Sequence, residues 1–168
     1  MSTLLLQHIV QSSDNDALWH QVLDHFLTTS QSGASLHLAV LLEPYLSYIL
    51  DGRKTVESRF SRRPTLPFGR VSPNDVVLLK RSAGPVIAAC GIGAVWSYHL
   101  DPDSWSELKH RFSSTLCAEG TFWDDRRHAE YATLMRLDWV RALTPVWIPK
   151  RDRRAWAVLK DGTRGRLF

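Results

Sequence analysis

Two apolar runs separated by a short turn constrain the fold of this chain more than any other feature. The runs are "DVVLLKR" (75–81) and "PVIAACGIGAVWSYHL" (85–100), and both have the composition of β-strands. The intervening "SAGP" predicts that they form a hairpin. Gly91 and Gly93 lie inside the second run, where glycine is typical of a bulge or a sharp bend. The hairpin therefore predicts a curled sheet.

Further strands and short helices flank this hairpin on both sides. The run 36–43 predicts a buried strand, Pro44 suits the first turn of a helix, and Gly52 is a natural helix terminator. The segment 101–112 predicts a helix capped by Asp101 or Asp103. The remaining expected elements are a strand at 54–61, a loop with three prolines at 62–75, a turn or short helix at 120–132, and strands at 133–143 and 153–159.

The first 35 residues have a different pattern. Apolar residues recur at helical spacing in "SDNDALWHQVLDHFLTT", and Ser13, Asp14 or Asn15 could cap that helix. "SQSGAS" (30–35) then reads as a flexible connector. We expect an N-terminal helical extension over 1–35, with its helix laid on the core of a second unit over 36–168.

The order of elements predicts an α+β fold. Strands exceed helices in the second half of the chain, which favours a small, curled β-barrel of mixed or antiparallel strands with helices at its openings. The content of 44% hydrophobic and 23% charged residues is that of a globular protein. The longest apolar runs are too short to span a bilayer and the start has no basic n-region, so we expect a soluble, cytoplasmic protein and no membrane partner.

The histidines and cysteines do not suggest a metal site. The seven histidines lack the i, i+4 pairing of a zinc-binding helix, and Cys90 and Cys117 lack metal-type spacing. We expect neither a metal nor a cofactor.

Basic residues are concentrated in two segments. Segment 53–70 has six against one acid, and the segment from Lys150 to the end has seven against two. If the fold brings these segments together, a polyanion such as nucleic acid is the favoured partner, because arginine matches phosphate oxygens bidentately. Either segment alone could equally be a solvated surface.

The stretch "DGRKTVESR" (51–59) is the main candidate for a site. If it is a strand, Thr55, Glu57 and Arg59 share one face, and the Arg–Glu pair could orient an amide or phosphate group of a ligand. Lys54 lies at the turn before this strand, where neighbouring arginines would lower its pKa and make it a conceivable nucleophile or base. The alternative is the solvated face of an edge strand.

These residues resemble the opening of the ASCH (activating-signal-cointegrator homology) domain, a relative of the PUA superfamily. The matching pattern is a strand, a short helix and then G-x-K-x-x-E-x-R, which falls on Gly52, Lys54, Glu57 and Arg59. The later "SPNDVVLLK" is similar to the family's following strand, with "ND" in place of a "GD" turn. The resemblance covers roughly residues 36–160 and implies a PUA-like β-barrel with a cleft beside the motif.

The resemblance also implies functions. ASCH domains are thought to bind RNA or other nucleic acids, and some act as ribonucleases or as amidohydrolases on acetylated cytidine. The amidohydrolase pattern resembles G-x-K-T-x-T and has threonine where this chain has Glu57, which disfavours that activity. A catalytic site would use Lys54, with Tyr48 and the carboxylate of Glu119, or with a hydroxyl of Ser58 or Thr121 for a ribonuclease.

The leading prediction is an RNA-binding or single-stranded nucleic-acid-binding ASCH domain. The alternatives are a nucleic-acid-directed hydrolase, including one that takes a modified nucleoside, and an adaptor that binds a protein through loop 62–75. Trp123 is the expected stacking platform for a base. The expected nucleic-acid contacts are Arg53, Lys54, Glu57, Arg59, Arg62, Arg63, Arg70, Trp123, Lys150, Arg151, Arg153 and Arg154.

Overall fold

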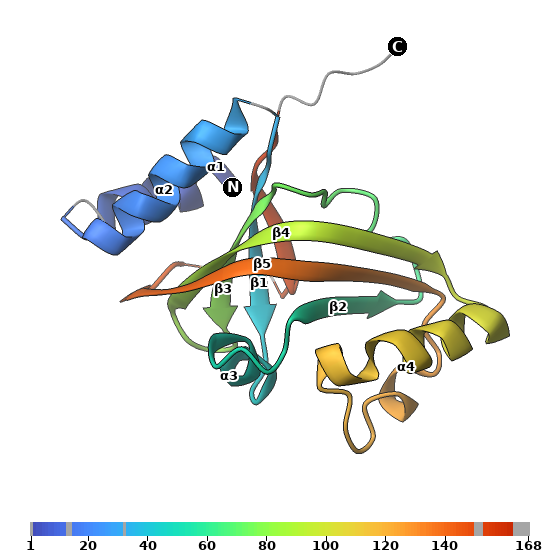
Figure 1. The fold of residues 1–168 in the computed structure, drawn as a ribbon. Helices are drawn as coiled ribbons and strands as arrows, with labels where there is room; N and C mark the ends of the chain where they lie inside the picture. Colours follow the sequence, from blue (N-terminus) through green and yellow to red (C-terminus); the bar gives the residue numbers. More distant parts are fainter. Residues whose placement is uncertain (1, 13–14, 32, 150–152, 163–168) are drawn as a thin grey trace, which may run out of the picture.

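A six-stranded mixed sheet curls into a half-barrel at the centre of the computed structural model (Figure 1). The strand order is β2-β5-β4-β3-β1-β6, with β1 parallel to β3 and every other neighbouring pair antiparallel. The structure describes all residues except 1, 13–14, 32, 150–152 and 163–168. The elements are α1 (Ser2–Ser12), α2 (Ala17–Ser30), β1 (Leu36–Leu41), α3 (Tyr45–Leu50), β2 (Val56–Ser61), β3 (Val76–Arg81), β4 (Val86–His99), α4 (Pro102–Leu116), the 3-10 helix η1 (Asp124–Arg126), β5 (Tyr131–Val146) and β6 (Trp156–Lys160).

The predicted hairpin is confirmed as β3 and β4, and the predicted bend lies at its two glycines. The pairing of β4 with β5 shifts register on both sides of Ile92. A Cβ atom on Gly91 would collide with the indole of Trp139, and one on Gly93 with the carboxylate of Asp138. Glycine at these positions therefore lets side chains of β5 cross over β4 where the sheet bends.

Helices cover three regions of the sheet. From α1 and α2, Ile9, Trp19 and Phe26 pack in one apolar cluster with residues of β1 and β3. On α3, Leu46 and Ile49 pack in a second apolar cluster with residues of β1, β3 and β4. A third cluster joins α4 to β2 and β5, and its α4 members are Leu108, Phe112 and Leu116.

Some predicted boundaries and caps differ from the structure. The first residues form a helix, α1, that the sequence did not suggest. Asp16, rather than Ser13, Asp14 or Asn15, caps α2, because its carboxylate accepts from the backbone N–H groups of Leu18 and Trp19. Ser13 and Asp14 lie outside the described residues. The predicted helix 101–112 continues to Leu116 after a capping box of Asp101 and Ser104, and the strand predicted at 133–143 extends at both ends.

Replacing Trp19 tests whether α2 contributes to the stability of the sheet. Trp19 is fully buried and its indole N–H donates to Thr144 O on β5 at 2.8 Å. Trp19→Ala should lower the free energy of unfolding by about 3–5 kcal/mol, because it leaves a cavity in the cluster shared with β1 and β3. Urea denaturation measures the change. The neighbouring Leu18 is 43% exposed, so Leu18→Ala should cost less than about 0.5 kcal/mol. Equal effects of the two substitutions would contradict the packing described.

Candidate functional site

A cleft of about 890 Å³ lies on the open side of the half-barrel. One side of the cleft is β2, the first strand of the sheet order. The opposite side is the end of β1 together with residues 153–155, which come just before β6, the last strand of the sheet order. Among the described residues no backbone pairing joins β2 to β1 or β6. The lining residues are Val40, Leu41, Leu42, Tyr45, Lys54, Glu57, Ser58, Arg59, Phe60, Lys80, Ser82, Ala83, Phe122, Asp125, Arg126, Arg153, Arg154 and Ala155.

Arg59 bridges the two sides of this opening. It lies on β2, and its Nη2 donates to Val40 O on β1 at 3.0 Å, while Nη1 lies 3.5 Å from Ala155 O. Its Nε is 3.1 Å from Glu57 Oε1, but the angle is too poor for a hydrogen bond, so this contact is an ion pair. A guanidinium thus connects strands that the backbone leaves unpaired.

Lys54 lies at the cleft floor because of the way α3 ends. Gly52 has a positive φ of 82° and terminates the helix, and Lys54 N then donates to Tyr48 O at 2.9 Å. The Lys54 side chain is 2% exposed. Its Nζ donates to Leu116 O at the end of α4 at 3.1 Å and lies 3.5 Å from Glu57 Oε2.

Burial lowers the pKa of the Lys54 ammonium, because the charged form loses its hydration. The Glu57 carboxylate opposes this effect and raises the pKa, and Arg126 adds a smaller lowering. Each oxygen of Glu57 faces one cation, Lys54 or Arg59. Glu57 therefore holds two cations at the cleft floor, with both of its oxygens already engaged.

Aromatic rings form one wall of the cleft. Phe60 on β2 and Phe122 before η1 are in edge contact, and Tyr45 packs against Phe122 in the same way. The Arg126 guanidinium lies over the Phe122 ring, 3.7 Å from its centroid, and its Nη1 donates to Phe122 O at 2.7 Å. This wall therefore offers apolar ring surface beside a cation of fixed orientation.

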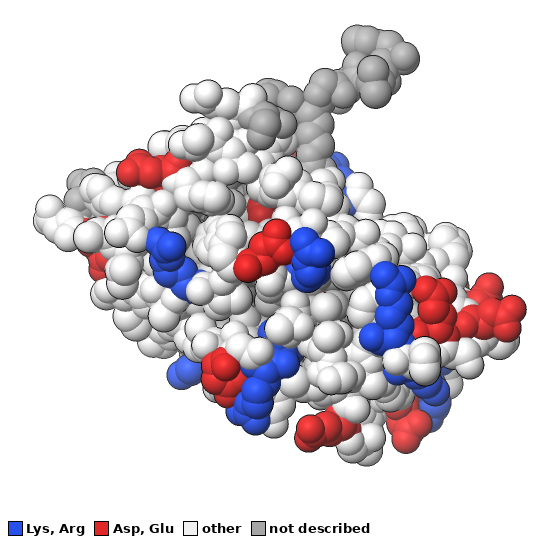
Figure 2. Space-filling model, in the orientation of Figure 1, with Lys and Arg blue, Asp and Glu red and all other residues white. Residues whose placement is uncertain are grey.

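The cleft lining is rich in cations. It contains six basic side chains (Lys54, Arg59, Lys80, Arg126, Arg153 and Arg154) against the two acids Glu57 and Asp125. By contrast, basic and acidic side chains are interspersed on the face of the molecule shown in Figure 2. The lining favours an anionic ligand with a flat or apolar part.

The structure brings part of both basic segments together. Lys54, Glu57 and Arg59 from the first and Arg153 and Arg154 from the second all line the cleft, as does Ser58. Thr55, expected on the same face as Glu57, precedes β2 and does not line the cleft.

Other predicted site residues lie elsewhere. Arg53 pairs with Asp51 and covers the Tyr48 ring, and Arg70 pairs with Asp161. Trp123, expected as a stacking platform, is half-buried between Phe60, Trp105 and Phe122 and donates to Ser113 Oγ. Lys150 and Arg151 lie outside the described residues. The predicted residues absent from the cleft lining are Tyr48, Arg53, Arg62, Arg63, Arg70, Glu119, Thr121 and Trp123.

Several lining residues had no role in the sequence-based prediction. Tyr45, Phe60, Phe122 and Arg126 form the aromatic wall, and Lys80 lies where the β3–β4 turn meets the cleft. The polar stretch that contains Trp123 also contains Phe122 and Arg126, so this segment does reach the cleft, although Trp123 itself does not line it. The alternation of side chains along a strand could not predict Phe60, because it places neighbouring residues such as Arg59 and Phe60 on opposite faces.

The described part of the chain shows neither a metal-binding cluster nor a membrane-spanning helix. Its His, Cys, Asp and Glu side chains form no group of three or more that could hold a metal ion. None of its helices has the length and apolar character needed to cross a membrane.

Substitutions at the cleft floor should affect stability unequally. Glu57→Gln leaves the buried Lys54 and the partly buried Arg59 without their acid and should cost about 3–5 kcal/mol at pH 7. Lys54→Met leaves Glu57 paired with Arg59 and removes an ammonium that burial disfavours, so it should cost about 1 kcal/mol or less. Urea denaturation of both variants measures the difference. A loss for Lys54→Met as large as that for Glu57→Gln would show that the cluster depends on Lys54 as much as on Glu57 and would contradict this prediction.

Comparison with known proteins supports the predicted fold. No protein-family sequence model matches the chain, and a search of curated proteins gave no match. Among solved structures, the ASCH protein of Zymomonas mobilis is 20% identical over 67% of this chain and 73% of its own, with a TM-score of 0.54. A single-substitution variant of that protein is 16% identical over 76% of this chain and 90% of its own, with a TM-score of 0.61. The chain therefore has the α+β, PUA-like fold of an ASCH domain.

Proposed function

We propose that the cleft binds single-stranded RNA. The observation that carries the proposal is the lining itself, in which six cations and three aromatic rings surround one opening. Single-stranded nucleic acid presents phosphates and ring faces together, and proteins bind it by combining cations with stacking surfaces. The likeness of the fold to ASCH domains agrees with this ligand.

The two walls have different roles in this proposal. Arg126, fixed on Phe122, and the exposed Arg153 and Arg154 on the opposite side contact phosphates, because guanidinium groups match their oxygens. Phe60 and Tyr45 receive a base. Glu57 holds Lys54 and Arg59 at the cleft floor, since each of its oxygens faces one of these cations.

Titration of a short, labelled single-stranded RNA at several salt concentrations tests the proposal. Affinity should fall as salt rises, because each phosphate contact releases a counterion. Arg126→Gln should weaken binding and reduce the slope of log K against log salt by about 0.7, the value for one contact on a single strand. Lys109→Gln removes a cation from α4 outside the cleft lining and should leave the slope unchanged. The proposal fails if the protein does not bind at low salt or if the two variants behave alike.

A specific observation favours a second candidate, a hydrolase of RNA or of a modified nucleoside. Lys54 is a buried amine at the floor of a cleft, and burial lowers its pKa. A lysine of this kind reaches its neutral form at lower pH than a solvated lysine and can then serve as a base or nucleophile.

The pH dependence of turnover tests the second candidate. If neutral Lys54 is required, cleavage should increase with pH through the lowered pKa and level off below the usual value for lysine of 10.5. Both Lys54→Ala and Lys54→Arg should abolish it, because arginine keeps its charge. The substrates are single-stranded RNA and acetylated cytidine. Turnover that persists in either variant would exclude Lys54 from the mechanism. If the wild-type protein leaves both substrates intact, the hydrolase candidate fails and the cleft is a binding site only.

A further inference from the structure

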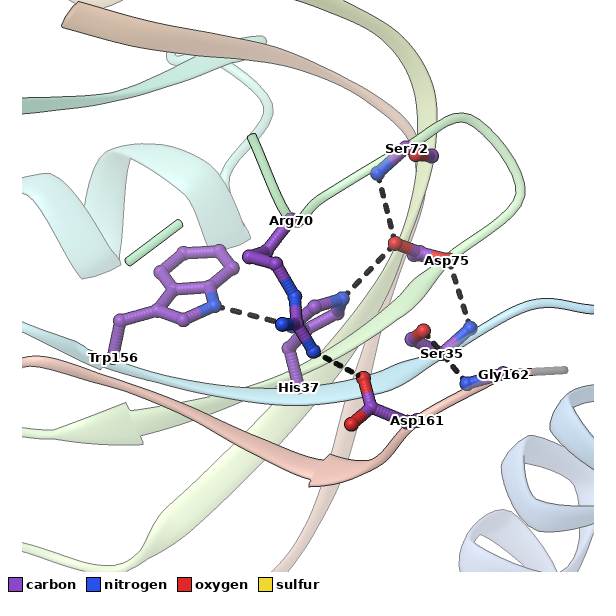
Figure 3. A network of polar contacts seen from close by, with 8 residues as sticks. All are labelled: Ser35, His37, Arg70, Ser72, Asp75, Trp156, Asp161 and Gly162. Atoms are coloured by element: carbon purple, nitrogen blue, oxygen red, sulfur yellow. Dashed lines mark hydrogen bonds and ion pairs between the residues drawn. The ribbon is translucent and has the colours of Figure 1, made fainter. Parts of the chain in front are cut away.

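A buried series of polar contacts links the start of β3 to the start of β6 (Figure 3). Asp75 and His37 are 0% exposed. The Asp75 carboxylate accepts from Ser35 N and Ser72 N, each at 2.8 Å, and lies 3.0 Å from His37 Nε2. On the other side of the imidazole, His37 Nδ1 lies 3.2 Å from Trp156 Nε1.

The chemistry of these groups fixes the position of each proton. An indole N–H can only donate, so His37 Nδ1 must accept and the imidazole hydrogen must lie on Nε2. That hydrogen is donated to Asp75, which as a carboxylate can only accept. The contact between His37 and Asp75 is therefore a hydrogen bond of a neutral imidazole, and it holds the tautomer that binds Trp156.

Trp156 connects this network to the cleft. Its ring lies beneath the Arg59 guanidinium, 5.3 Å from the ring centroid to Arg59 Cζ. The other contacts of Arg59 are the Glu57 carboxylate and backbone carbonyls across the opening. The indole is thus the aromatic surface on which the Arg59 guanidinium rests.

We propose that His37 is a positioning residue for the cleft, in the tautomer that Asp75 holds. Through its hydrogen bond to the Trp156 indole, His37 sets the height and orientation of the Arg59 guanidinium. It thereby sets the affinity of the cleft for the phosphate groups of its ligand, although it does not line the cleft. The effect on affinity rests on the proposed function, whereas the position of Arg59 is a property of the free protein.

Four substitutions separate a positioning role from a merely structural one. Trp156→Phe keeps a ring beneath Arg59 but removes the N–H, and His37→Leu removes the acceptor. His37→Asn restores an acceptor oxygen near the place of Nδ1 and loses only the contact with Asp75. The matched control is Trp19→Phe, which also removes a buried indole hydrogen bond, the one from Trp19 to Thr144 O, at a site away from the cleft.

Binding of the labelled single-stranded RNA gives the first measurement. Trp156→Phe and His37→Leu should each weaken binding by about two- to tenfold, the range for one hydrogen bond, and their effects should not add in the double variant. His37→Asn should recover most of the affinity. Trp19→Phe should lower stability without changing affinity. Additive losses, or equal losses for the control, would overturn the proposal.

Nuclear magnetic resonance of the free protein gives the second measurement. The Arg59 Nε–H signal should move in Trp156→Phe and His37→Leu and stay in place in Trp19→Phe. If the wild-type protein binds no RNA, the proposed function fails. The Arg59 Nε–H signal then remains the test of whether His37 and Trp156 position Arg59. An Arg59 signal that is the same in all variants would overturn the inference whatever the RNA result.

Discussion

The ion cluster of Lys54, Glu57 and Arg59 holds three parts of the fold at one point. Lys54 binds the last carbonyl of α4, Arg59 binds a carbonyl of β1, and Glu57 lies between the two cations. Buried charges are costly unless they are paired, so these three side chains must remain together in the folded protein. Side chains rather than a strand ladder therefore bridge the open side of the half-barrel, and the space left between them is the cleft.

The same residues consequently serve the fold and the candidate site. Each oxygen of Glu57 already faces a cation, and Arg59 uses part of its donor capacity on carbonyls across the opening. In the proposed function, contacts with a phosphate come mainly from cations outside the cluster, such as Arg126 on its aromatic wall. Arg59 also lies over the Trp156 ring, and His37 accepts a hydrogen bond from that indole. Arg59 therefore contacts Glu57 and the Trp156 ring as well as the backbone carbonyls.

Much of the fold could be predicted because its signals are local. The hairpin of β3 and β4, the bend at Gly91 and Gly93 and the helix end at Gly52 follow from apolar runs and from glycine's backbone freedom. The G-x-K-x-x-E-x-R motif is local in the same way, and its Lys54, Glu57 and Arg59 line the cleft. The aromatic wall could not be predicted, since Tyr45, Phe60 and Phe122 meet only through tertiary packing and look like ordinary core residues in the sequence.

The sequence by itself determined the order of the strands, the turn that presents Lys54 and the placing of Glu57 and Arg59 on one strand. These features depend on residues within a few positions of one another. Only the tertiary structure decided which of many arginines reach the cleft and which pair elsewhere. The curl of the sheet brings 153–155 beside β2 while leaving Arg70 paired with Asp161, and curl is set by long-range strand pairing that no local pattern encodes.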